Sequence, residues 1–210
     1  MDLIELMNAN VYLTNIMLLP CILFIVLIIR NIQKWKNNSG LVIQQFYFLC
    51  FWYCYLFVFI VGIVLSCLYH YYMFEERPVI HKIAKLDPHF SAPLLCIFGG
   101  VLFILYYLYL QHPCSNIIPS IKRITVPIYY IALIFSTLGV LSYVARKKWY
   151  PEWNENNYFK CRFLCMHIFF HYMTYTGSIL LLLLYYIEIR PIFKAFFQTY
   201  DTCSDIIKLE

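Results

Sequence analysis

Two histidines, His167 and His171, stand four residues apart in an apolar stretch that contains no acidic residue and no lysine. If the stretch is helical, both imidazoles project from the same helix face. Two imidazoles on one face can occupy adjacent coordination positions of a metal ion, for which histidine is the commonest ligand. The pair therefore predicts a metal site near the start of this segment.

A third histidine, a serine and an aspartate complete the predicted site. Ser66 and His70 repeat the spacing of four residues, and Asp87 follows them in the sequence. Zinc held by three histidines, here His70, His167 and His171, keeps a fourth position for water, as catalytic zinc sites do. Zinc lowers the pKa of bound water to about 7. We expect Asp87 to accept the proton of that water or to orient the water, and Ser66 to bond a substrate carbonyl or a histidine. The alternative for each histidine alone is a packing role, in which it hydrogen bonds to a neighbouring helix.

The elements that must position these residues are transmembrane helices. Of the 210 residues, 62% are hydrophobic and only 13% are charged, whereas soluble domains carry about 25% charged residues. A transmembrane helix needs about 20 consecutive apolar residues, and the alternation typical of membrane strands is absent. The sequence predicts an all-α, polytopic transmembrane helix bundle, a single integral membrane domain over residues 1–210. Its five expected spans cover about 11–29, 41–70, 90–110, 124–144 and 163–187, and Pro20 is expected to kink the first.

Five spans deliver the predicted site residues to one side of the membrane. The second span ends on the side where the N-terminus lies, and the third and fifth begin there. His70, Asp87 and the histidine pair therefore meet at one depth. The 16 Lys and Arg residues divide evenly between the two sides, so the positive-inside rule sets no orientation.

The cysteines and the charge indicate little further chemistry. The nine cysteines are odd in number, and most lie inside apolar runs, so we expect free, buried thiols. Cys161 and Cys165, four residues apart just before the histidines, form an alternative thiolate metal site. The net charge of +5 is spread over loops, which argues against a nucleic-acid partner. The N-terminus lacks a basic region and a cleavage site, so no cleaved signal peptide is expected.

Several motifs together resemble the progestin and adipoQ receptor family, which includes the hemolysin III proteins. They are SCLYH from Ser66, AKLDPHFSAPLL from Ala84, ARKKWYPEW from Ala145 and MHIFFH from Met166, and their order and spacing match that family. The segment HYMTYTGSILLLLLYY is similar to the alkaline ceramidases of the wider superfamily. The resemblance covers about 60–110 and 140–187. The chain is shorter than the family, with five predicted helices in place of seven, and HPCSNIIPSIKRIT stands where the fourth and fifth family helices would lie.

The resemblance implies a function and a ligand set. It implies that His70, His167 and His171 hold Zn2+, with Asp87 and Ser66 completing the site of a hydrolase that cuts a lipid amide such as ceramide. The alternative is a non-enzymatic membrane receptor or signalling protein with a structural zinc, and a pore or transporter ranks last. The resemblance also favours a cytosolic metal site, in either the plasma membrane or an endomembrane (ER or Golgi). Because two family helices are missing, a homodimer is a further expectation.

Overall fold

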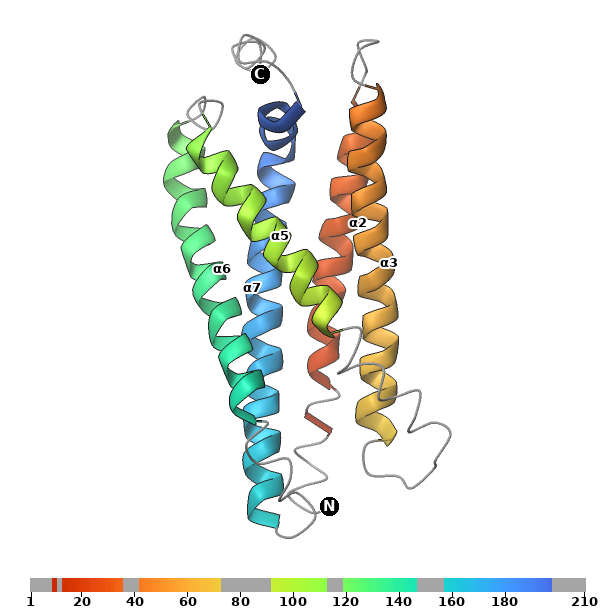
Figure 1. Cartoon of the computed structure of the whole chain (residues 1–210), viewed down its shortest axis with the longest axis vertical. Coiled ribbons are helices and arrows are strands. Elements are labelled where there is room, and N and C mark those ends of the chain that lie inside the picture. The colour runs from red at the N-terminus through yellow and green to blue at the C-terminus, as the bar shows by residue number, and fades with distance from the viewer. Residues whose placement is uncertain are drawn as a thin grey trace.

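The computed structural model describes residues 9–10, 13–35, 42–72, 92–112, 119–146 and 157–197. Over these ranges the chain forms a bundle of long helices (Figure 1), preceded by one short 3-10 turn. The elements are η1 (Asn15–Leu18), α2 (Leu19–Gln33), α3 (Val42–Tyr72), α5 (Ala92–Gln111), α6 (Pro119–Arg146) and α7 (Asn157–Phe197). The described part of the chain contains no strand, which confirms the all-α prediction.

Four helical segments are long and apolar enough to cross a membrane. They are Asn15–Gln33, Ile43–Tyr69, Pro93–Gln111 and Ile121–Ala145, and they overlap the first four predicted spans. This supports the predicted integral membrane location. The fifth predicted span, 163–187, is helical within α7 but is not among the four.

Helix α7 lies against the other elements of the bundle, which explains why it carries polar residues. It contacts η1, α2, α5 and α6, and Figure 1 shows it running the length of the bundle behind α5. Buried side chains occur along it from Phe163 to Ala195. Polar residues inside a membrane protein face the bundle interior rather than lipid. A helix surrounded in this way therefore does not need an apolar surface on every side.

The most extensive helix contact joins α6 and α7, and small residues permit it. A Cβ added at Gly177 would lie 2.9 Å from the carbonyl oxygen of Ala132 and 3.0 Å from the backbone nitrogen of Ser136. A Cβ added at Gly139 would lie 2.9 Å from the backbone nitrogen of Thr174. Small residues let transmembrane helices approach closely enough for backbone contact. The two glycines therefore hold α6 against the helix that carries the histidine pair.

The arrangement of the helix ends agrees with the predicted topology. Figure 1 shows that α3 ends and α7 begins at the same end of the bundle, which is also where η1 lies. The 3-10 geometry of η1 ends at Leu18, and α2 begins at Leu19. Pro20, where the sequence predicts a kink, lies in the first turn of α2, a position where proline is tolerated because its missing N–H would have no partner within the helix.

Candidate metal centre and its cavity

The structure brings the two predicted histidines of α7 into direct contact. His167 and His171 are 3% and 2% exposed, and their Nε2 atoms are 3.2 Å apart. At this distance one ring donates a hydrogen bond to the other, or both lone pairs can face one ion. Two nitrogens bound to one tetrahedral zinc at about 2.0–2.1 Å lie roughly 3.3 Å apart. The separation of the two Nε2 atoms therefore fits a shared zinc ion.

The hydroxyl of Thr14 contacts the ring nitrogen of His171 that points away from His167. The Nδ1 atom of His171 lies 3.0 Å from Oγ1 of Thr14, which is 2% exposed and directly precedes η1. Metal-binding histidines commonly donate their other ring N–H to an oxygen, which fixes the tautomer and the ring orientation. If His171 donates from Nδ1 to Thr14, its Nε2 keeps the lone pair that a metal requires.

The amide of Asn15 connects three elements beside the histidines. Its Oδ1 accepts hydrogen bonds from Ser66 Oγ of α3 at 3.2 Å and from the Tyr175 hydroxyl of α7 at 3.1 Å. Its Nδ2 donates to the Cys67 sulfur at 3.7 Å. Tyr175 follows His171 by one further helical turn, and their rings are 4.9 Å apart. Ser66 therefore lies in the same polar cluster as the histidine pair, and its hydroxyl donates to Asn15.

The third predicted ligand and the predicted acid are not placed. The backbone of His70 belongs to α3, one turn after Ser66, but its side chain lies outside the described residues, and Asp87 lies outside them altogether. Over the part of the chain that the structure describes, no group of three His, Cys, Asp or Glu side chains could hold a metal. The roles of His70 and Asp87 stay predictions.

The described cysteines are free thiols, as predicted, but the expected burial holds for Cys21 alone among them. The others are half-buried or exposed, because their helix faces point away from the bundle core. Of the pair that offered an alternative metal site, Cys161 is half-buried and Cys165 is exposed. Their sulfurs do not form a described cluster with the histidines, so the histidine pair is the better metal-binding candidate.

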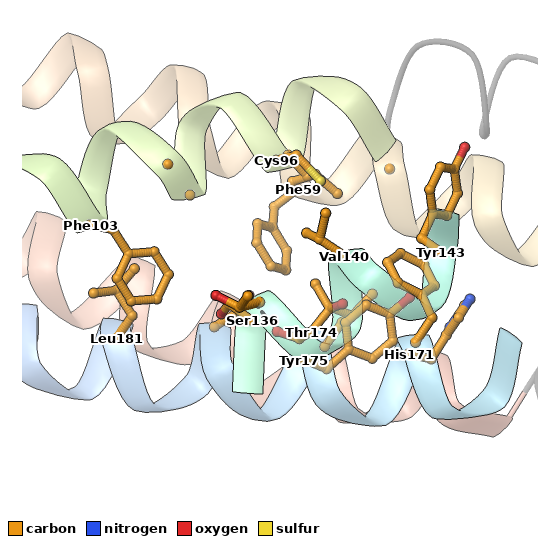
Figure 2. Close-up of a pocket in the computed structure, with 18 of the residues that line it drawn as sticks. Phe59, Cys96, Phe103, Ser136, Val140, Tyr143, His171, Thr174, Tyr175 and Leu181 are labelled. Atoms are coloured by element: carbon orange, nitrogen blue, oxygen red, sulfur yellow. Dashed lines mark hydrogen bonds between the residues drawn. The ribbon is translucent and has the colours of Figure 1, made fainter. Parts of the chain in front are cut away.

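A cavity of about 450 Å³ extends from the histidines into the bundle (Figure 2). Ser66, His167 and His171 line one end, whereas Phe103 and Leu181 line the far end. The fourteen positions from His167 to Leu181 correspond to about 21 Å of helix at about 1.5 Å per residue. Pockets of roughly 300–1,000 Å³ bind small molecules. The space is a long apolar slot with a polar cluster at one end.

Three residues of the polar cluster and one separate acid were missed by the sequence reasoning. Thr14, Asn15 and Tyr175 belong to the cluster, and Tyr175 continues the four-residue spacing of the histidines, so that spacing could have revealed it. Glu188 directly follows the predicted end of the fifth span at 187. It is 5% exposed and accepts hydrogen bonds from Tyr106 and Tyr109 of α5.

Comparisons with protein-family models, with curated proteins and with solved structures find no match to this chain.

Proposed function

We propose that the chain is a membrane-embedded, zinc-dependent hydrolase of a lipid amide, similar in chemistry to a ceramidase. The observation that carries the proposal is the 3.2 Å separation of the Nε2 atoms of His167 and His171 at the polar end of a long apolar cavity. A single-chain segment of a lipid fits the slot by shape and polarity. A zigzag of C–C bonds about 1.5 Å long advances roughly 1.25 Å per bond, so about 21 Å accommodates roughly 17 chain carbons.

Each polar residue has a stated role in this proposal. His167 and His171 hold zinc together with His70, which stands one helical turn beyond Ser66 on α3. Bound zinc supplies Lewis-acid polarisation of the amide carbonyl and a water of lowered pKa. Asp87 accepts the proton of the attacking water and returns it to the leaving amine.

The Asn15 network positions these groups rather than reacting. The Ser66 hydroxyl faces the cavity and is held by Asn15 Oδ1, and Tyr175 is oriented by the same oxygen. Thr14 keeps His171 in the tautomer that leaves Nε2 available. Because η1, α3 and α7 all contribute, a small displacement of η1 would disturb the whole cluster.

We also propose that α7 is a fifth transmembrane span, with the N-terminus and the metal on the cytosolic side. Its contacts with η1, α2, α5 and α6 place the polar residues of the span in the bundle interior. The proposed substrate is then a ceramide-like lipid that is already dissolved in the bilayer.

A zinc that only ties helices together is the second candidate function, because the hydrogen bonds of Asn15 and Thr14 join η1, α3 and α7. In that case the protein would be a receptor or signalling protein. Asp87→Ala separates the two functions. An enzyme would keep its zinc and lose hydrolysis of a fluorescent ceramide, whereas a structural site would show no hydrolysis in the wild-type protein either.

The experiment that tests the proposal combines zinc analysis with that hydrolysis assay on purified protein. Wild-type protein should contain about one zinc per chain, as three-histidine sites do. His167→Ala and His171→Ala should lose both the zinc and the turnover. His112→Ala is the matched control, because His112 follows the far end of α5. Unchanged zinc content in both site variants would refute the proposed centre.

A further inference from the structure

The two halves of α5 are held in different ways, and the difference begins with Glu188. This residue has non-helical backbone angles (φ −111°, ψ 16°) inside α7, three positions before Pro191. Its buried carboxyl group accepts hydrogen bonds from the hydroxyls of Tyr106 and Tyr109, the latter at 3.2 Å. A polar group buried without hydrogen-bond partners is costly, so both tyrosines are needed where they are. Glu188 therefore fixes the C-terminal half of α5 against α7.

Two further tyrosines strengthen this attachment. The Tyr185 hydroxyl of α7 donates to the Leu102 carbonyl oxygen at 2.7 Å. The Tyr129 hydroxyl of α6 donates to the Phe103 carbonyl oxygen at 3.2 Å. Four side-chain hydrogen bonds thus hold α5 between Leu102 and Tyr109. Three of them join it to α7 and one joins it to α6.

The N-terminal half of α5, residues 93–101, is held by apolar contacts. Its clearest contacts are the ring of Phe98 with Tyr55 at 5.3 Å and with Phe51 at 5.6 Å. Among the residues that the structure describes, no side chain hydrogen bonds to this half. Only 17% of the span Pro93–Gln111 is buried inside the protein, the lowest share of the four spans. Moving this half would therefore break few interactions with the rest of the bundle.

Two glycines mark the junction between the held and the loosely held halves. A Cβ added at Gly99 or Gly100 would meet nothing within 4 Å, so close packing does not require glycine at either position. Gly139 and Gly177 differ, because an added Cβ there would collide with the facing helix. Glycine is among the least favourable residues in a helix interior, so the adjacent pair is a point of easy bending.

The cavity lies directly beside this half of α5. Cys96, Gly99 and Gly100 all line it, and Figure 2 shows Cys96 of α5 and Val140 of α6 on the cavity. We propose that residues 93–101 form a lateral gate, which bends at Gly99 and Gly100 while residues 102–109 stay fixed, and admits a lipid chain from the bilayer into the cavity. The nature of the ligand rests on the proposed function, whereas the motion of the gate does not.

A reversible cross-link tests the gate in the full chain. Val140→Cys would be joined to native Cys96 by a reducible bis-maleimide, with the other cysteines replaced by alanine and the protein in phosphatidylcholine nanodiscs. The probe is a dansyl-labelled undecanoic acid, and its uptake is followed by stopped-flow fluorescence. Cross-linking should slow uptake by about tenfold or more, since lid opening limits access, and reduction of the linker should restore it.

The matched control is a cross-link at the fixed end of α5. Tyr107→Cys and Tyr130→Cys, exposed positions on α5 and α6, would be joined in a background with Cys96→Ala. This cross-link should leave the uptake rate unchanged. Equal uptake by the Cys96–Val140→Cys protein before and after cross-linking would overturn the gate, and so would a complete failure of the uncross-linked protein to bind the probe.

A second variant avoids any cross-link. The double substitution Gly99→Ala and Gly100→Ala adds methyl groups that meet nothing within 4 Å, so the bundle should fold. Both glycines line the cavity, so the readout is the two rates rather than Kd. A stiffer junction should slow association and dissociation of the probe, each by about fivefold or more. Association and dissociation rates equal to those of the wild type would contradict the gate. Uptake requires neither zinc nor hydrolysis, so loss of the proposed enzyme activity would leave this result standing.

Discussion

The four glycines discussed above provide a matched test of the α6–α7 interface. In Gly177→Ala the new methyl would sit 2.9 Å from the Ala132 carbonyl oxygen and 3.0 Å from the Ser136 backbone nitrogen. Both distances are well inside van der Waals contact, so α6 and α7 must separate. Overpacking of this kind costs about 1–3 kcal/mol. In Gly100→Ala the methyl would meet nothing within 4 Å, and the gain in helix propensity is up to about 1 kcal/mol.

The assay for this pair is thermal unfolding in detergent, followed by circular dichroism. For a chain of this size about 1 kcal/mol shifts Tm by roughly 2–4 °C. We expect Gly177→Ala to lower Tm by about 2–12 °C and Gly100→Ala to leave it unchanged or raise it by up to about 4 °C. A Gly177→Ala protein with the Tm of the wild type would refute the close α6–α7 contact. A strongly destabilised Gly100→Ala protein would refute the open space at the glycine pair.

Three further substitutions test the polar clusters. Thr14→Val removes the oxygen beside His171 Nδ1 and should weaken zinc affinity by about 10–100-fold. Thr14→Ser keeps the hydroxyl and should bind zinc as tightly as the wild type, measured by competition titration with a chelator. Equal zinc affinity in the wild type and both variants would show that the Thr14 hydroxyl does not support His171. Asn15→Leu leaves the hydroxyls of Ser66 and Tyr175 without their acceptor, which costs about 1–3 kcal/mol for each. In denaturant unfolding Asn15→Asp, which keeps an acceptor oxygen, should be clearly more stable than Asn15→Leu. An equal loss of stability in both variants would count against the hydrogen bonds to Oδ1. Glu188→Leu removes the acceptor of Tyr106 and Tyr109 and should lower the free energy of unfolding by about 1–3 kcal/mol for each hydroxyl. Glu188→Gln, which keeps one acceptor oxygen, should have a stability between those of Glu188→Leu and the wild type. If unfolding shows Glu188→Leu to be as stable as the wild type, the proposed attachment of α5 is wrong.

Much of the fold was predictable because hydrophobic length is a direct signal of a membrane helix. Four predicted spans coincide with apolar helices, and the order of the helices fixed which ends meet. The ends of the elements were less predictable. Helix α7 continues to Phe197, well beyond the predicted end of the fifth span at 187, where the charged residues Glu188 and Arg190 indicate the end of a span. Two tyrosines from another helix satisfy that carboxylate, and such a contact is not visible in the local sequence.

The candidate site likewise has a part that the local sequence predicts and a part that depends on tertiary contacts. The contact between His167 and His171 follows from helix periodicity alone, and so does the position of Tyr175 one turn further. Thr14 and Asn15 could not be placed in this way, because they precede and open a short 3-10 turn that packs against α2, α3 and α7. Their roles come from tertiary hydrogen bonds across the bundle, which no local pattern encodes.

The measurement that tests the central claim most directly is zinc-edge X-ray absorption on the purified, zinc-loaded protein. If His167 and His171 share the ion, the spectrum should show imidazole nitrogens at about 2.0–2.1 Å, and His171→Ala should lose a nitrogen neighbour or the zinc itself. A spectrum that is the same in the wild type and in His171→Ala, or one with sulfur neighbours at about 2.3 Å, would contradict a metal centre built on this histidine pair.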